Sequence, residues 1–279
     1  MQAAPASSPS PSQPQLQVLI FVRRNLTITT PSEFSRRWRE THGPLVCTIG
    51  VIQRNIRRYE QLHVNYEMKL KLRAMGLDIP DTYDGVTLFE VDSIDKLCEV
   101  FDDAEYQEKV VPSEFRLFDM GSIKYGCFHS TTFINKTTPD RIRNFNSTAP
   151  NFDENSGRLL LNLFKRDDLT FEHFDRYWLE THSKVVIDIP IAREKITLYE
   201  QLHLHPDPAP ELPHPTMKGQ DRSEADGLVV LQSTSLEEIF DLIYFNEEFR
   251  QVSGPDEVKF TKSISQSPMI LPLDVVSLI

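Results

Sequence analysis

The sequence predicts an α+β fold in which two tandem repeats form an intrachain, pseudo-dimeric α/β barrel. The pentapeptide Tyr-Glu-Gln-Leu-His occurs twice, at residues 59–63 and at residues 199–203. A Trp-x-Glu-Thr-His motif precedes each copy, at residues 38–42 and 178–182. Both motifs recur at the same offset of 140 residues (178 − 38 and 199 − 59). A fixed offset across two separate motifs indicates an internal duplication.

The first repeat is predicted to span residues 16–120. Apolar and alternating runs indicate strands at residues 16–22, 56–64, 86–91 and 115–120. A helix is expected over residues 32–50, because Thr30-Pro31-Ser32 is typical of a helix start, and a second over residues 93–101. The resulting order β-α-β-β-α-β is that of the ferredoxin-like unit.

The second repeat is predicted to span residues 158–262 in the same order. Its strands are expected at residues 159–164, 197–205, 228–232 and 258–261, and its helices at residues 170–187 and 235–249. Residues 121–157 are expected to connect the repeats through a strand-like stretch and a polar loop. Residues 1–15 are rich in Ala, Pro, Ser and Gln, which predicts a disordered tail. The apolar tail at residues 263–279 is expected to pack on the body.

The composition excludes several classes of partner. A formal charge of −11 argues against binding to nucleic acid or to an anionic membrane surface. No apolar run is long enough to span a membrane, and the start of the chain lacks the features of a secretory signal. The cysteines Cys47, Cys98 and Cys127 are odd in number and far apart, which favours reduced thiols and a cytoplasmic location.

The alternation of the repeated strand predicts where a ligand would bind. Two ferredoxin-like sheets can meet through the faces that their helices leave uncovered, and so close into a barrel. On the first copy Tyr59, Gln61 and His63 share one face, and on the second copy Tyr199, Gln201 and His203 do the same. Because the opposite face is mostly apolar and suits packing under helices, we expect these polar rows to line the lumen as a small-molecule site.

Several motif blocks, in order, resemble the EthD domain of the dimeric α/β-barrel superfamily. The blocks are Pro31-Ser32-Glu33-Phe34, Trp38, Thr41-His42-Gly43-Pro44-Leu45, Arg58-Tyr59-Glu60-Gln61-Leu62-His63, Tyr83-Asp84-Gly85 and Asp103-Ala104-Glu105-Tyr106. The resemblance covers residues 16–120 well and residues 158–262 less well. It implies kinship with bacterial accessory proteins and with fungal tailoring enzymes of polyketide pathways, often described as dehydratases. His182 is followed by Ser183-Lys184 where the first repeat has Gly43-Pro44, so the first repeat is expected to hold the working site.

The candidate catalytic residues are His42, His63 and Tyr59. Histidine can exchange a proton near neutral pH, so one His could remove a C–H proton next to a carbonyl. The other His, or Tyr59, would then protonate the departing hydroxyl. Gln61 would stabilise the enolate. The remaining predicted substrate-binding residues are Trp38, His182, Tyr199, Gln201 and His203. A structural role remains the alternative for all of them, since a buried Tyr–His pair can satisfy itself and a Trp can serve the core.

The predicted function is that of a cofactor-independent tailoring enzyme that dehydrates a β-hydroxy carbonyl or hydroaromatic, polyketide-like substrate. The alternatives are a cofactor-free anthrone-type oxygenase and a non-catalytic small-molecule-binding barrel. A metal site formed by His203, His205 and His63 is not predicted, because Asn65 stands in the first repeat where the second has His205, and no convergent carboxylates are evident. No haem or flavin motif is present. The chain is expected to be a monomer, with further oligomerisation left open.

Overall fold

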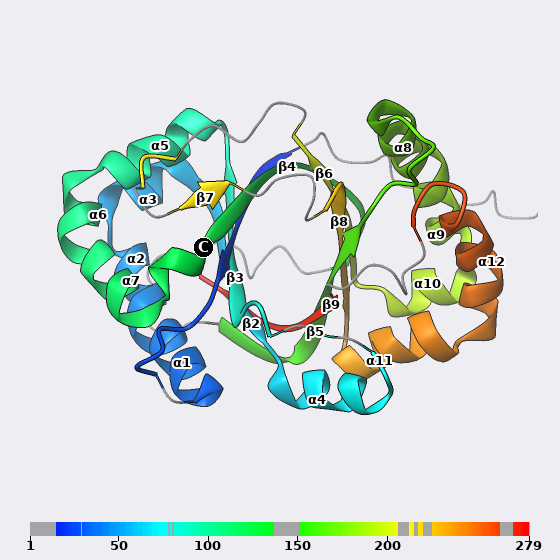
Figure 1. Cartoon of the computed structure of the whole chain (residues 1–279), viewed down its shortest axis with the longest axis horizontal. Helices are drawn as coiled ribbons and strands as arrows, with labels where there is room; N and C mark the ends of the chain where they lie inside the picture. Colours follow the sequence, from blue (N-terminus) through cyan, green and yellow to red (C-terminus); the bar gives the residue numbers. More distant parts are fainter. Residues whose placement is uncertain are drawn as a thin grey trace, which may run out of the picture.

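The chain folds into one closed β-barrel with a layer of helices on either side (Figure 1). The computed structural model describes residues 15–28, 30–77, 79, 81–136, 151–205, 212–214, 217–219, 225–262 and 270–278. The predicted fold class, an α+β pseudo-dimeric barrel of two repeats, is confirmed. The expected tail before residue 15, most of the loop at residues 136–157 and most of the Pro-rich stretch between residues 206 and 215 lie outside the described residues.

The first repeat contributes four barrel strands, β1 (Gln15–Val22), β2 (Ile56–Val64), β3 (Gly85–Val91) and β4 (Lys124–Asn135). Its helical segments are α1 (Pro31–Arg37), the π-helical turn η1 (Trp38–His42), α2 (Gly43–Cys47), α3 (Gly50–Asn55), α4 (Tyr66–Ala74), α5 (Ile94–Asp102), α6 (Ala104–Lys109), α7 (Val111–Leu117) and the 3₁₀ turn η2 (Met120–Ser122).

The second repeat contributes β5 (Asn151–Leu163), β6 (Leu198–Leu204), β8 (Gly227–Ser233) and β9 (Ile270–Ser277), and the short β7 (Lys218–Gly219). Its helical segments are α8 (Phe171–Tyr177), the π-helical turn η4 (Trp178–His182), α9 (Ser183–Asp188), α10 (Pro190–Lys195), α11 (Leu236–Phe240), the π-helical turn η5 (Asp241–Phe245) and α12 (Glu247–Glu257).

The fourth strand of each repeat joins it to the other repeat. β4 pairs with β1 of its own repeat and with β6 of the second, whereas β9 pairs with β5 and with β2 of the first. The prediction of fourth strands at residues 115–120 and 258–261 is wrong, because the first range overlaps α7 and the second follows α12. Short apolar runs do not distinguish a strand from a buried helix face. The actual fourth strands begin beyond both predicted repeat boundaries, 120 and 262.

Both faces of the sheet are buried, and the predicted assignment of the polar rows to the lumen is wrong. The barrel interior is an apolar cluster drawn from all eight strands, and it contains Leu62 and Leu202. Tyr59 and Tyr199 belong instead to two separate clusters under the helices, the helix-side cores of the first and the second repeat. The error has a physical cause: alternation separates the two faces of a strand, but a closed barrel covers both, so polarity does not reveal which face points inward.

One end of the barrel interior holds buried ion pairs. Arg158 on β5 binds Glu60 on β2, and Arg58 binds both Glu60 (3.0 Å) and Glu200 on β6 (3.3 Å). Arg158 also donates hydrogen bonds to Gln232 (Nη2 to Oε1 2.8 Å). Since Glu60 and Arg158 come from different repeats, this network ties the two halves of the barrel together.

The two tryptophans of the repeated motif pack on the glycines of the two Asp-Gly pairs, at residues 84–85 and 226–227. A Cβ atom added to Gly85 would lie 2.4 Å from the Trp38 ring, and one added to Gly227 would lie 2.4 Å from the Trp178 ring. Each indole therefore lies directly on the first residue of a strand, β3 or β8, where only glycine leaves room.

The connections that follow β2 and β6 cross to the opposite repeat. Met68 and Leu72 on α4 pack in the helix-side core of the second repeat. Leu212 and Met217, from the connection after β6, pack in that of the first repeat. There β7 also pairs with β4, as Figure 1 shows. None of the helices in the described ranges is long and apolar enough to cross a membrane.

Candidate functional site

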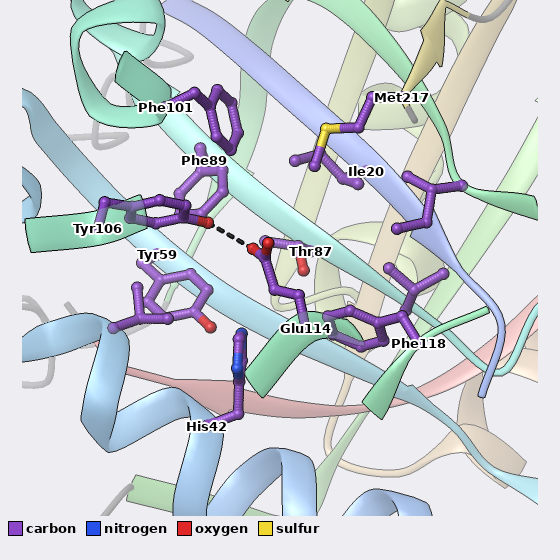
Figure 2. A pocket seen from close by; sticks show the side chains of 13 residues that line it. Ile20, His42, Tyr59, Thr87, Phe89, Phe101, Tyr106, Glu114, Phe118 and Met217 are labelled. Atoms are coloured by element: carbon purple, nitrogen blue, oxygen red, sulfur yellow. Dashed lines mark hydrogen bonds between the residues drawn. The ribbon is translucent and has the colours of Figure 1, made fainter. Parts of the chain in front are cut away.

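A cavity lies in the first repeat between the helix-facing side of the sheet and the helices that cover it (Figure 2). Strands β1, β2 and β3 form its floor, and η1, α2, α5, α6 and α7 form its walls. Most lining side chains are apolar or aromatic. The polar ones include His42, Tyr59, Thr87, Tyr106 and Glu114. The centres of water molecules can reach about 20 Å³ of it, which is room for one or two waters.

His42 ends the π-helical turn η1 and points into the cavity (Figure 2). Its side chain is 4% exposed, and Nδ1 lies 3.1 Å from the Ser113 hydroxyl on α7. Among the described residues, no second hydrogen bond reaches the ring. Burial lowers the pKa of His42 to about 4, although the charge of Glu114 acts in the opposite direction. His42 is therefore a neutral imidazole at neutral pH and can accept a proton.

Glu114 on α7 is a buried carboxylate beside His42, and the repeated sequence motifs do not predict it. The Tyr106 hydroxyl donates a 2.5 Å hydrogen bond to Oε1, while Oε2 has no hydrogen-bond partner among the described side chains. The sequence holds a signal for it. The Asp-Gly pairs at residues 84–85 and 226–227 are offset by 142 (226 − 84), and that offset aligns Glu114 with Asp256.

Tyr59 supplies a phenol to the cavity floor. Its ring stacks on Phe89 at 5.0 Å, and its oxygen accepts a 3.0 Å hydrogen bond from Nε2 of Gln61. The phenol hydrogen has no acceptor among the described residues. Burial raises the pKa of Tyr59 well above its usual value, so the group stays protonated. Tyr59 can therefore donate a hydrogen bond to a bound molecule.

Trp38, Gln61 and His63 do not line the cavity. Nε2 of Gln61 also donates to the Trp38 carbonyl (3.2 Å), and Oε1 lies 3.3 Å from Nε2 of His63. Nδ1 of His63 meets the Ser35 hydroxyl at 2.9 Å, and its ring packs 4.5 Å from that of Trp38. Burial, with a smaller effect of Arg39, lowers the pKa of His63 to about 3. These residues tie β2 to the helix above it.

The second repeat reproduces this tie with Gln201, Tyr199 and Trp178 (Nε2 of Gln201 to the Tyr199 hydroxyl 2.6 Å and to the Trp178 carbonyl 3.1 Å). His203 lies 2.7 Å from an oxygen of Asp175, where the first repeat has Ser35.

In the second repeat both oxygens of the Asp256 carboxylate accept hydrogen bonds, unlike those of Glu114 in the first repeat. Asp256 receives the Tyr177 hydroxyl (2.7 Å) and the Lys259 ammonium (2.9 Å) on one oxygen, and Nδ1 of His182 (2.8 Å) on the other. Burial lowers the pKa of His182, against the opposing effect of Asp256. The two predicted sites are thus unequal, and only the first presents a carboxylate oxygen without a hydrogen bond.

The histidines considered as metal ligands do not converge. His63 lies in the first repeat and His203 in the second, and each packs on the tryptophan of its own repeat. His205 packs instead against His129, with ring centroids 4.7 Å apart. Within the described part of the chain, no group of three or more His, Cys, Asp or Glu side chains is placed to hold a metal ion.

The family model for the EthD domain matches the chain twice, at residues 27–121 and 166–263. The chain belongs to the EthD domain family. The two matches place one EthD domain in each repeat, so the tandem organisation inferred from the 140-residue offset is confirmed. No curated protein matches this EthD chain by sequence.

Two solved structures share the barrel of this tandem EthD protein. An anthrone oxidase-like protein covers 95% of the chain with 92% of its own length, at 8% identity and a TM-score of 0.50. A protein proposed to be a monooxygenase, from Fusobacterium nucleatum subsp. nucleatum, covers 95% with 93% of its own length, at 10% identity and a TM-score of 0.51. At these identities the likeness shows the common fold.

Proposed function

We propose that the first repeat is a cofactor-independent acid–base enzyme that dehydrates a β-hydroxy carbonyl compound of aromatic, polyketide-like character. The observation that carries the proposal is the buried set of His42, Glu114 and Tyr59 in one aromatic-walled cavity. A neutral imidazole, a carboxylate and a protonated phenol are the groups that an elimination through an enolate requires.

Each group has a role that its contacts support. His42 removes the proton from the carbon next to the substrate carbonyl, and the electron pair moves onto the carbonyl oxygen as an enolate. The Tyr59 hydroxyl donates a hydrogen bond to that oxygen and keeps its proton. The imidazolium that forms at His42 is stabilised by the charge of Glu114, which already favours the protonated ring.

The second half of the reaction returns the proton. When the enolate collapses, a carbon–carbon double bond forms and the bond to the β-hydroxyl breaks. His42 passes its proton to the departing hydroxyl, which leaves as water, so the residue ends in its starting form. Gln61 and His63, predicted to take part directly, instead hold Tyr59 and the Trp38 helix in place under this proposal.

The cavity walls suit a flat aromatic substrate. Phe89, Phe101 and Phe118 line the space together with Tyr59 and Tyr106. Aromatic rings pack well against such faces and edges. The accessible space of about 20 Å³ is smaller than any such substrate, so binding requires the lining side chains to move outward, as interface side chains commonly do on binding.

Identification of the substrate tests the proposal. Metabolites that accumulate in a strain lacking the gene are supplied to the purified protein in D₂O, and the products are followed by mass spectrometry. We expect a product lighter by one water, deuterium exchange at the carbon next to the carbonyl, and turnover that does not depend on dissolved oxygen.

Two controls set the limits of the proposal. His42→Gln is expected to lower turnover about 10² to 10⁴-fold, the usual contribution of a positioned base. Tight binding without any product would mean that the barrel only binds its ligand. An oxygen-dependent product that has gained an oxygen atom would replace dehydration by anthrone-type oxygenation, the activity for which one structural neighbour is named.

A further inference from the structure

A histidine from the second repeat packs against Phe101 and Glu114, two residues that line the cavity of the first repeat. His214 follows β6 in the chain, yet it is 4% exposed and its ring packs edge-on against Phe101 of α5 (72° between planes). Two hydrogen bonds fix the backbone around it. The Leu212 amide donates to the Tyr125 hydroxyl on β4 (3.1 Å), and the His214 amide donates to the Leu212 carbonyl (2.7 Å).

The imidazole of His214 faces the open oxygen of Glu114. Nε2 lies 3.5 Å from Oε2 of Glu114, which is an ion-pair distance rather than a hydrogen bond. The other carboxylate oxygen is held by Tyr106 from α6. Tyr106 and His214 therefore approach the two oxygens of the carboxylate separately, one from each repeat. Contacts of this kind are often long without ligand and tighten when the site closes.

In the second repeat, the corresponding carboxylate has no partner from the other repeat among the described residues. Asp256, the counterpart of Glu114, takes all its partners from its own repeat: Tyr177, His182 and Lys259. In the first repeat, His42 turns Nδ1 to Ser113 instead of the carboxylate. Glu114 thus accepts no hydrogen bond from His42, the histidine of its own repeat, and is paired instead with His214 of the second repeat.

We propose that His214 is a positioning residue of the first-repeat site, which is therefore assembled from both repeats. Its Nε2–H holds Oε2 of Glu114 so that the carboxylate stays in place to stabilise the charge that forms on His42. This inference rests on the proposed acid–base function and adds a residue to it. No other residue in the described part of the second repeat carries an ionisable group that is paired with Glu114.

Two substitutions of similar size separate positioning from packing. His214→Gln keeps an N–H near the position of Nε2, whereas His214→Leu fills the space without a donor. We expect His214→Leu to lower kcat about 10-fold to 10²-fold, the effect of a small misplacement of a catalytic group, with little change in KM. His214→Gln should retain kcat within a few-fold. If His214→Leu does not fold, the more flexible His214→Met takes its place.

A second readout does not depend on turnover. NMR titration of the His42 ring in the full-length protein should give a changed pKa in His214→Leu and the wild-type pKa in His214→Gln. Equal kcat and equal His42 titration in wild type and His214→Leu would overturn the inference, as would equal losses in the Leu and Gln variants. Unchanged turnover in His42→Gln would instead overturn the proposed function, whatever the His214 variants do.

Discussion

Arg158 on β5 and Glu60 on β2 form an ion pair inside the barrel, and this pair links the second repeat to the first. Both side chains are less than a tenth exposed. Burial alone would raise the pKa of Glu60, but Arg158 and Arg58 outweigh burial and lower it to about 2. The barrel interior therefore holds a charged group whose ionisation depends on the other repeat.

Loss of one partner of this pair should strongly destabilise the protein. Arg158→Leu leaves Glu60 buried with only Arg58 as a charged partner, and we expect the free energy of unfolding to fall by about 3–5 kcal/mol in denaturant titrations. The double variant Arg158→Leu, Glu60→Leu removes both charges and should recover much of that loss. A double variant less stable than Arg158→Leu alone would show that the charge on Glu60 is not the source of the cost.

The same pair predicts how stability depends on acid. Because the pKa of Glu60 is lower in the folded chain, its contribution is fully present above the ordinary value of 4.5 and is lost as the pH falls towards 2. Glu60→Gln should therefore flatten the fall in the free energy of unfolding across this range. An unchanged acid profile in Glu60→Gln would contradict the assignment.

Gly85 should tolerate no side chain. In Gly85→Ala the new Cβ would lie 2.4 Å from the Trp38 ring and 2.7 Å from the Leu62 carbonyl oxygen. We expect a loss of about 1–3 kcal/mol, as for other overpacked sites, seen as a lower Tm. Gly254→Ala in α12 is the control, since apart from its chain neighbours and its own helix backbone nothing lies within 4 Å of its added Cβ. Its stability should stay within about 0.5 kcal/mol of wild type, because the helix preference of alanine is offset by crowding against Pro255.

The pH dependence of turnover should identify His42 as the base. With a pKa of about 4, His42 is neutral over the physiological range and becomes protonated only below it. We expect kcat/KM to be flat around neutral pH and to fall about tenfold per pH unit below 4. Glu114→Gln removes the charge that raises this pKa, so the acid limb should move to lower pH. A limb near pH 6.5 that Glu114→Gln does not move would point to a different base.

His63 should matter for stability rather than for chemistry. Its folded pKa of about 3 lies below the ordinary value of 6.5, so the unfolded chain binds a proton that the folded chain does not. Stability linked to His63 is therefore present above pH 6.5 and declines as the pH falls towards 3. His63→Gln should reduce that decline in acid unfolding and lower the kcat of the folded protein far less than His42→Gln does. A loss of kcat comparable to that of His42→Gln would return His63 to the catalytic set.

The repeat made the overall fold predictable, but not the orientation of its strands. A constant offset between the Trp-x-Glu-Thr-His and Tyr-Glu-Gln-Leu-His motifs is enough to establish two similar units. The alternation of β2 then separates Tyr59 from Leu62 correctly. It cannot say which of them faces the lumen, because the helices and the barrel interior bury both. The fourth strands were misplaced for a related reason, since Phe115 and Leu117 are as apolar as a strand requires.

The candidate site was half predictable. His42 and Tyr59 follow from the repeated motifs, and both line the cavity. Glu114 was not predicted, because the offset between the repeats changes from 140 to 142 residues before it. Its counterpart is also Asp256 rather than a second Glu. His214 carries no local signal, since its place beside Glu114 depends on a connection that crosses from one repeat to the other.

The fusion of the two repeats in one chain has a consequence for how their carboxylates can differ. In a dimer of identical chains every substitution appears twice, so both copies of a site must serve the same purpose. Here a change at Glu114 leaves Asp256 untouched. One acidic position can keep an oxygen without a hydrogen bond, while the other is fully paired with Tyr177, His182 and Lys259. Because both repeats lie in one chain, the second repeat can take on a structural role while the first keeps the candidate site.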